Sequence, residues 1–301
     1  MDDSFRIIAD TDNVRIDVYL SERLSLPRSR VKNLIEGGHV RVQDRIPKPS
    51  FKVKRNIEIE GEITSEEPVL LVAEDIPVKI LYEDDYLLVI DKPKDMVVHP
   101  SLGHRQGTLV NAILNYVRET DRDRNDRPGI VHRLDKGTTG VIIVAKDRKT
   151  QETLSSQFHE RSVEKVYRAV VEGETKVEEG VVEGEIGRHP RDRKRMAMVA
   201  KGGKGGRSSF SRFKVIRRLK GFTYVEVYPK TGRTHQIRVH MSHIGHPVVG
   251  DELYGKRARR LTDRPLLHAY RITFDHPEKG DKVFVEAPVP ADMQEFVDTH
   301  G

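Results

Sequence analysis

The chain has 301 residues, of which 33% are charged, and its mean hydropathy of −0.58 predicts a soluble protein long enough for two domains. It contains no cysteine, which excludes disulfides and thiolate metal sites. Its apolar runs of about five residues are far shorter than the roughly 20 that a membrane span requires. The first residues show no basic and apolar leader, so we expect a cytoplasmic protein without membrane association.

The net charge is +6, and the positive residues gather in two tracts. Residues 28–55 hold nine Lys or Arg and two Asp or Glu, and residues 188–220 hold thirteen and one. Such tracts occur on ordinary solvated surfaces and are also typical of surfaces that contact a polyanion. The separation of the two tracts favours two contacts with a nucleic acid.

The N-terminal part predicts a small folded unit behind an extension, residues 1–13, that contains one short strand. Apolar residues recur at helical spacing over residues 16–24, and a second helix is expected at 30–36. Two glycines follow that helix and end it. Residues 39–42 alternate as a strand that turns directly into the next one.

This order of helix, basic helix, glycine pair and basic hairpin resembles the S4 RNA-binding domain, an αL-like fold, over residues 14–62. The resemblance implies that cations on one side of the unit meet RNA phosphates, which position an RNA without reading its sequence. A module that docks an acidic protein is the alternative. The cations assigned to this contact are Arg28, Arg30, Lys32 and Arg41.

Residues 63–77 contain several acidic residues and two prolines and predict a linker to a second domain, residues 78–301. That domain opens with a strand, an acidic turn and a buried strand over residues 80–92, which a proline ends. Amphipathic helices are expected at 108–117 and 150–158.

The most informative stretch is residues 129–146, in which two apolar β-branched runs flank a polar loop. The second run predicts a strand that is buried on both faces. Asp135 lies where the chain enters the loop. A lone Asp before a glycine turn is usually an Asx-turn residue. Because His132 and Arg133 lie beside it, we favour a reactive carboxylate carried on a rigid sheet.

This stretch resembles the signature His-Arg-Leu-Asp-x-x-Thr-Ser/Thr-Gly of the RluA family of pseudouridine synthases, with Gly137 where the family often has Asp. Further similarity at residues 92–100, 164–171 and 231–255 extends the resemblance over nearly the whole chain. The insert at residues 188–197 is most similar to the D type of this family. The resemblance implies an α+β fold, in which a mixed, mainly antiparallel central sheet forms the catalytic domain.

The family converts uridine to pseudouridine: the N1–C1′ bond breaks, the base turns, and a C5–C1′ bond forms. The resemblance implies that Asp135 is the catalytic acid, that Arg238 pairs with it, and that Tyr167 stacks on uracil and removes the C5 proton. Ile237 would form an apolar floor. Whether Asp135 attacks C1′ or takes the C2′ proton stays open. The reaction requires no metal and no nucleotide or redox cofactor.

The target base must leave its stack, which costs a few kcal/mol. Arg133 either fills the gap with its flat guanidinium or contacts a phosphate, and His132 is assigned to the same RNA contact. The expected partner is 23S (large-subunit) rRNA or its precursor, with tRNA and other rRNA sites left open. We expect a monomer.

Two other functions are weighed against the synthase. One is an RNA-binding assembly factor with an inactive catalytic fold, which would release no C5 tritium from labelled RNA. The other is a metal-dependent hydrolase that uses Asp251 and four histidines. Their spacings of 5, 3 and 3 match no metal site with a known mechanism, so no metal is predicted. The four histidines are His235, His240, His243 and His246.

Overall fold

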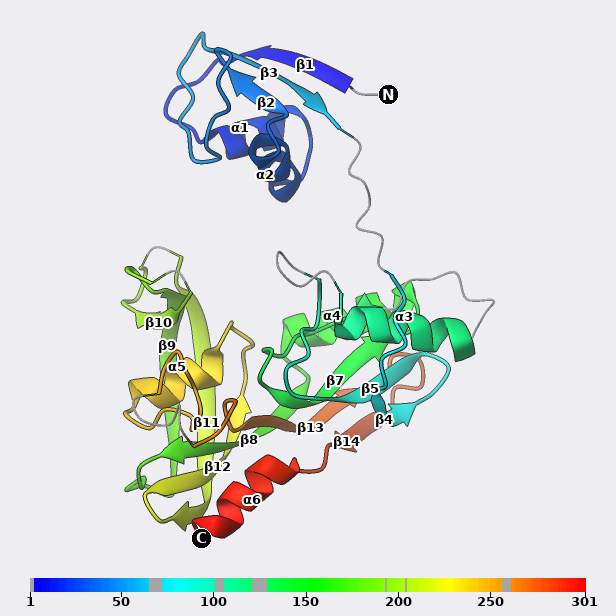
Figure 1. Cartoon of the computed structure of the whole chain (residues 1–301), viewed down its shortest axis with the longest axis vertical. Helices are drawn as coiled ribbons and strands as arrows, with labels where there is room; N and C mark the ends of the chain where they lie inside the picture. The colour runs from blue at the N-terminus through cyan, green and yellow to red at the C-terminus, as the bar shows by residue number, and fades with distance from the viewer. Residues whose placement is uncertain are drawn as a thin grey trace. The chain divides into compact units, whose positions relative to one another are not determined.

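The computed structural model of the chain divides into two compact units, Met1–Leu70 and Leu71–Gly301 (Figure 1). No described helix is long and apolar enough to cross a membrane. The structure describes residues 3–64, 72–100, 106–120, 129–192, 194–203, 205–255 and 261–301.

The first unit packs two helices, α1 (Ile16–Arg23) and α2 (Arg28–Glu36), against a small sheet. The strands are β1 (Asp3–Ile8), β2 (Val40–Val42) and β3 (Glu58–Ile63), in the order β1-β3-β2. Apolar residues of the helices and strands meet in one core, as their helical and alternating patterns predicted. The strand that sequence reasoning set apart in an extension pairs with β3 along its whole length.

The hairpin expected after residue 42 does not form as a pair of consecutive strands. The turn itself is present, since Gln43 and Asp44 have φ of 49° and 62° and Val42 bridges to Arg45. Pro47 and Pro49 follow, and because proline cannot donate a ladder hydrogen bond, no strand continues there. The later β3 supplies the partner of β2 instead.

The second unit is built on one sheet, which has 11 strands within the described residues. Its strand order is β10-β9-β11-β12-β8-β13-β7-β5-β4, with β6 paired to β7 and β14 paired to β13. Every pair is antiparallel except β7–β13, which confirms the mixed, mainly antiparallel sheet. The strands are β4 (Lys79–Glu83), β5 (Leu87–Lys92), β6 (Gly129–Ile130), β7 (Thr139–Ala145), β8 (Glu164–Glu172), β9 (Glu179–Arg188), β10 (Met196–Val199), β11 (Arg207–Leu219), β12 (Phe222–Pro229), β13 (Leu267–Asp275) and β14 (Lys282–Glu286).

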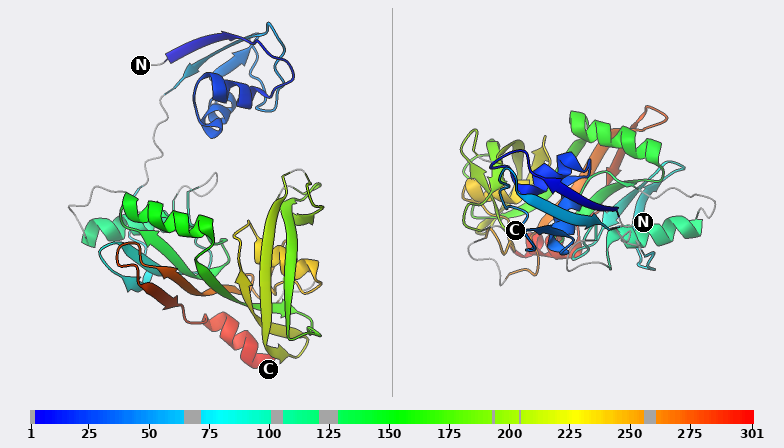
Figure 2. Two further views of the ribbon diagram at one scale, coloured as in Figure 1. Left: turned by 180° about the vertical axis from the view of Figure 1, so that it is seen from behind. Right: turned by 90° about the horizontal axis from the view of Figure 1, so that it is seen from above.

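Four described helices cover this sheet: α3 (Leu109–Thr120), α4 (Arg148–Glu160), α5 (Gln236–His243) and α6 (Ala291–Thr299) (Figure 2). The apolar faces of α3 and α4 join a core with β5 and β7, as their periodicity predicted. Separate cores form where α5 packs on β8 and β12, and where α6 packs beside Val170 and Tyr224.

The β7 strand is buried along its whole length, as expected for a strand covered on both faces. It begins just after the loop that carries Asp135. At its start, Gly140 has a φ of +106°, and a Cβ there would lie 2.1 Å from the carbonyl oxygen of Ala269 in β13. Only glycine allows this close approach, so Gly140 fixes the Asp135 loop beside β13 and β8.

Candidate active site

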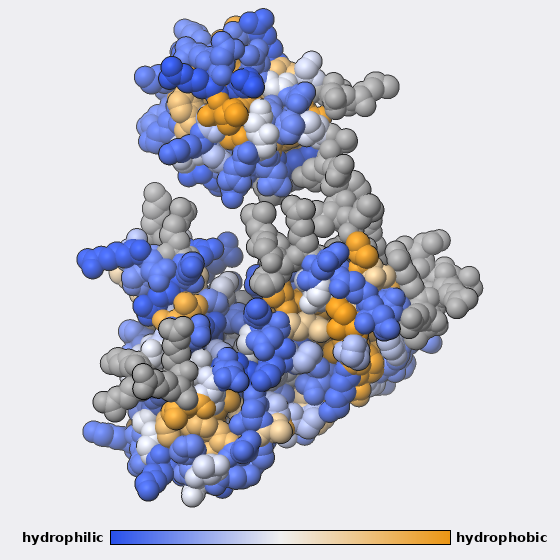
Figure 3. Space-filling model, viewed as in Figure 1, coloured by the Kyte–Doolittle hydropathy of each residue, from blue (hydrophilic) through white to orange (hydrophobic). Residues whose placement is uncertain are grey.

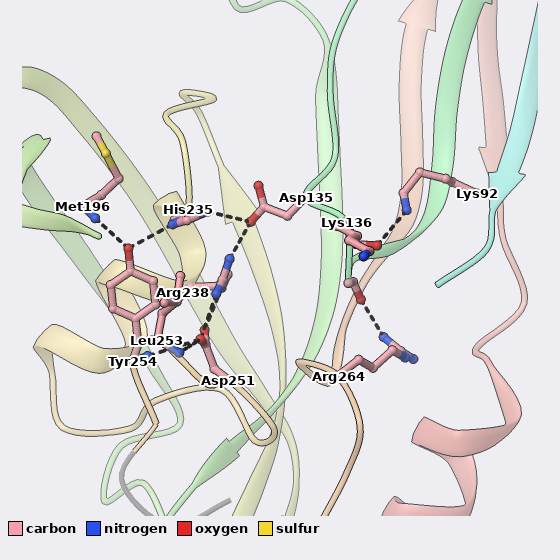
Figure 4. Close-up of polar contacts among 11 residues, drawn as sticks. Lys92, Asp135, Lys136, Met196, His235, Arg238, Asp251, Leu253, Tyr254 and Arg264 are labelled. Carbon is pink, nitrogen blue, oxygen red and sulfur yellow. Dashed lines mark hydrogen bonds and ion pairs between the residues drawn. The ribbon is translucent and has the colours of Figure 1, made fainter. Parts of the chain in front are cut away.

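The main chain after Asp135 is held from two sides by buried cations (Figure 4). Lys92 donates to the carbonyl oxygen of Lys136 at 3.2 Å, and Arg264 donates to that of Gly137 at 3.3 Å. The Thr138 N–H closes the turn onto the Asp135 carbonyl oxygen at 3.0 Å. Burial lowers the pKa of Lys92 to about 8, against the attraction of the Asp135 carboxylate. The loop is therefore pinned through its backbone.

Arg238 joins two carboxylates. Its Nη1 donates to Asp135 Oδ2 at 3.0 Å, while its Nε and Nη2 form a fork onto Asp251 at 2.6 and 2.8 Å. Burial alone would lower the pKa of Arg238, but the hydrogen bonds and charges of Asp251 and Asp135 raise it above its ordinary value. The expected Asp135–Arg238 pair is present in the structure.

Asp251 orients this arginine and was missed as such by sequence reasoning, which considered it only as a metal ligand. Its side chain is fully buried, and its Oδ1 also accepts the N–H groups of Leu253 and Tyr254 at 3.0 and 3.2 Å. Because all these partners come from the tight turn and α5, no periodicity in the sequence signals the contact.

Two hollows meet at Asp135. The smaller, about 100 Å³, is lined by Tyr167, Ile237 and Leu267 among others. The larger, about 670 Å³, is lined by His99, Lys136 and Arg264 among others. The residues common to both are Arg133, Leu134, Asp135, His235 and Arg238. The carboxylate thus lies where a smaller and a wider hollow meet.

Tyr167 lies on β8 and Ile237 lies on α5, and both residues line the smaller hollow. Burial, and after it the charge of Asp135, raises the pKa of the Tyr167 phenol well above its ordinary value. The phenol is therefore protonated at neutral pH, which makes it a weak proton acceptor before substrate enters.

Arg133 is exposed at the rim of both hollows, where an RNA strand could reach it. His132 lines neither hollow. Its ring stacks on Phe158 with centroids 4.7 Å apart, and its Nε2 accepts the Ile143 N–H at 2.9 Å. Burial lowers the pKa of His132 to about 3, so the ring is neutral. These contacts give His132 a packing role, and the RNA contact expected of it from sequence stays a prediction.

Sequence reasoning expected the S4 cations on one side of the first unit, and the structure does not place them all there. Along α2, Arg28 and Lys32 are one turn apart, whereas Arg30 lies on the other flank of the buried stripe formed by Val31 and Ile35. Arg28 also pairs with Asp17 at 2.9 Å. Lys32 and Arg41 are exposed. The visible face of the first unit is largely hydrophilic, with some hydrophobic residues among the polar ones (Figure 3).

The histidine group does not converge. His235 contacts Tyr254, His240 contacts Ser209, and His246 contacts the Glu172 carbonyl oxygen. Among the described residues, no three His, Asp or Glu side chains form a metal-ligand group. The hydrolase alternative therefore has no ligand set in this part of the chain.

Comparison with known proteins identifies the class. Residues 86–243 match the family model described as RNA pseudouridylate synthase, and residues 14–59 match the S4 domain. The chain therefore belongs to the RNA pseudouridine synthases, as its motifs indicated, and its activity is the isomerisation of uridine in RNA.

Individual relatives agree with this class. An uncharacterised RNA pseudouridine synthase of Chlorobaculum parvum is 41% identical, over 93% of this chain and 92% of its own. Ribosomal large subunit pseudouridine synthase D of Neisseria meningitidis is 40% identical, over 93% of this chain and 76% of its own. The solved structure of human RNA pseudouridylate synthase domain containing 1 is 27% identical and covers 72% of this chain and 85% of its own, with a TM-score of 0.58.

Proposed function

We propose that Asp135 is the catalytic carboxylate with which this pseudouridine synthase modifies a uridine of 23S (large-subunit) rRNA or its precursor. The observation that carries the proposal is the position of Asp135, at the meeting point of the two hollows with Arg238 3.0 Å away. A charged oxygen at that point can face the sugar of a nucleotide whose base enters the smaller hollow.

The lining of each hollow supports this placement of the substrate. Uracil enters the smaller one, where Tyr167 and Ile237 offer aromatic and apolar contact. The sugar and the neighbouring nucleotides occupy the larger, which is lined by the exposed Lys136 and by Arg133. Arg238 orients the Asp135 oxygen through its hydrogen bond, because Asp251 holds its guanidinium in place.

The chemistry then needs one carboxylate and a closed space. Asp135 either adds to C1′ or takes the C2′ proton, the N1–C1′ bond breaks, and the smaller hollow retains the detached uracil while it turns. C5 then bonds to C1′, and as it does so either the Asp135–C1′ bond breaks or the C2′ proton returns to the sugar. The C5 proton leaves, and N1 takes up a proton. Since Tyr167 is protonated before substrate enters, we assign it first to contact with the base and only second to that proton transfer.

Arg133 is proposed to occupy the gap left by the flipped base. It is exposed at the rim of both hollows, two residues before Asp135. A planar guanidinium stacks between bases better than an ammonium does. A phosphate contact at the same position stays the alternative.

The choice of RNA rests on relatives and on charge. The Neisseria relative is named for the large ribosomal subunit, and an S4 domain precedes the catalytic unit. Ribosomal RNA as substrate supports the expected cytoplasmic location. We propose that the protein acts as a monomer.

Mapping pseudouridines in total RNA from cells that lack the gene tests the proposal. At least one large-subunit rRNA site should be missing, and the wild-type gene but not Asp135→Asn should restore it. Loss of a tRNA site alone would overturn the rRNA target. Restoration by Asp135→Asn would overturn the role of the carboxylate.

A further inference from the structure

A chain of contacts leads from the edge of the sheet to the Asp135 carboxylate (Figure 4). The N–H of Met196, the first residue of β10, donates to the Tyr254 hydroxyl oxygen at 2.8 Å. That oxygen lies 3.0 Å from Nδ1 of His235, and Nε2 of the same ring lies 3.9 Å from Asp135 Oδ2. Asp135 is thus approached by His235 as well as by Arg238.

The pattern of donors assigns the hydrogens along this chain. Because the Tyr254 oxygen already accepts from Met196, its own hydrogen can donate to His235 Nδ1. A neutral imidazole that accepts at Nδ1 carries its hydrogen on Nε2, the atom nearest Asp135. Burial lowers the pKa of His235, and the charge of Asp135 opposes this effect only in part. The ring is therefore neutral at pH 7.

Tyr254 is the junction of this chain. It is buried, and the guanidinium carbons of Arg195 and Arg238 lie 5.3 and 5.2 Å from the centre of its ring. Arg195 directly precedes β10, which pairs only with β9 within the described residues. One aromatic side chain therefore contacts the β10 edge, the arginine that binds Asp135, and His235.

His235 is held in a backbone conformation that favours glycine. Its φ of 56° and ψ of 21° are left-handed, just before α5 begins. A non-glycine residue persists there only where its surroundings fix it. The contact with Tyr254 supplies that constraint and aims the ring at the carboxylate.

We propose that His235 and Tyr254 are positioning residues for the Asp135 carboxylate and connect it to β10, part of the second basic tract. This inference rests on the proposed role of Asp135. Tyr254 lines neither hollow, and His235 faces Asp135 from the wall that both hollows share, so we expect substitutions of either residue to act on the rate of isomerisation more than on RNA affinity. β10 belongs to the tract that we expect to contact RNA. The position of β10 then influences the orientation of the Asp135 carboxylate.

Single-turnover rates and RNA dissociation constants of full-length variants test the proposal. Tyr254→Phe removes the central hydroxyl, and His235→Asn removes the reach to Asp135 while suiting the left-handed backbone. Each should lower the rate by about tenfold and leave the dissociation constant within about threefold. The double variant should be no slower than the slower single one, since both act through one chain.

Two further variants complete the test. Tyr82→Phe is the matched control, because Tyr82 lies on β4, at the other end of the sheet, and the change removes its phenol hydrogen bond to Asp84 and should leave the rate unchanged. Met196→Pro removes the N–H donor at the β10 edge, together with the Met196 side chain that packs in the cluster around Tyr254, and should slow the reaction at least as much as Tyr254→Phe does. Wild-type rates for Tyr254→Phe and His235→Asn, or multiplying losses in the double variant, would overturn the positioning role.

The outcome for Asp135→Asn separates the two proposals. If that variant is inactive while Tyr254→Phe and His235→Asn react normally, only the positioning role is wrong. If Asp135→Asn turns over normally, the proposed role of the carboxylate fails first. A normal rate for Met196→Pro alone would overturn the connection to β10.

Discussion

At the scale of single residues, the site depends on the ion pairs that Arg238 forms with Asp135 and Asp251. Arg238 is almost completely buried, with 8% of its side chain exposed, and Asp251 is fully buried. A buried ion pair of this kind is costly to break, because removal of one partner leaves the other charge without compensation. The same pair leaves one arginine nitrogen for Asp135.

Asp251→Asn should therefore lower the free energy of unfolding by about 3–5 kcal/mol and slow catalysis as well. Denaturant unfolding measures the first effect. Glu152→Gln is the control, because it breaks the exposed Arg148–Glu152 pair and should cost less than about 1 kcal/mol. Equal stability losses in the two variants would show that the Asp251 pair is not energetically distinct.

Asp135, Arg238, Tyr167 and Ile237 were predictable because each lies in a motif with fixed spacing, and the structure brings all four around one hollow. Asp251 and His235 were not, since their partners are reached only after the turn and α5 fold against each other. The orientation of His132 was equally unpredictable, because a histidine at a strand end can face either the loop or the core.

At the scale of elements, helices α1 to α4 and strands such as β5 and β7 follow from hydrophobic period, whereas α6, β13 and β14 were not predicted. Hydrophobic period cannot predict the parallel pairing of β7 with β13, which joins residues about 130 positions apart and places the Asp135 loop. Gly140 makes that contact possible. The pairing of β2 with β3 likewise depends on two prolines excluding the nearer segment.

Gly140→Ala should destabilise the protein by at least roughly 2 kcal/mol, because the added methyl group meets the Ala269 carbonyl oxygen at a left-handed φ. Thermal or denaturant unfolding measures the change. Gly232→Ala is the matched control, since its Cβ would meet nothing within 4 Å. Wild-type stability of Gly140→Ala would mean that β13 does not need this approach.

At the scale of the whole molecule, the two units have separate cores and different expected roles. The first unit carries exposed cations such as Lys32 and Arg41, and the second carries the carboxylate and its hollows. Phosphate contacts made by the first unit should add affinity that declines with salt, without taking part in the reaction.

The double variant Lys32→Gln, Arg41→Gln should thus reduce the slope of log affinity against log salt by roughly 0.7–0.9 per lost phosphate contact. Its rate at saturating RNA should equal that of the wild type. Lys282→Gln, on β14 of the second unit, is the control and should leave the slope unchanged. An unaltered slope in the double variant would assign RNA contact to other residues.

The most direct measurement of the central claim is release of tritium from C5-labelled uridine in large-subunit rRNA by purified Asp135→Asn protein. The substitution keeps the shape of the side chain and removes the charge that Arg238 holds. We expect no release above background, with RNA affinity within about threefold of wild type. Release at the wild-type rate would contradict the assignment of Asp135 as the catalytic carboxylate.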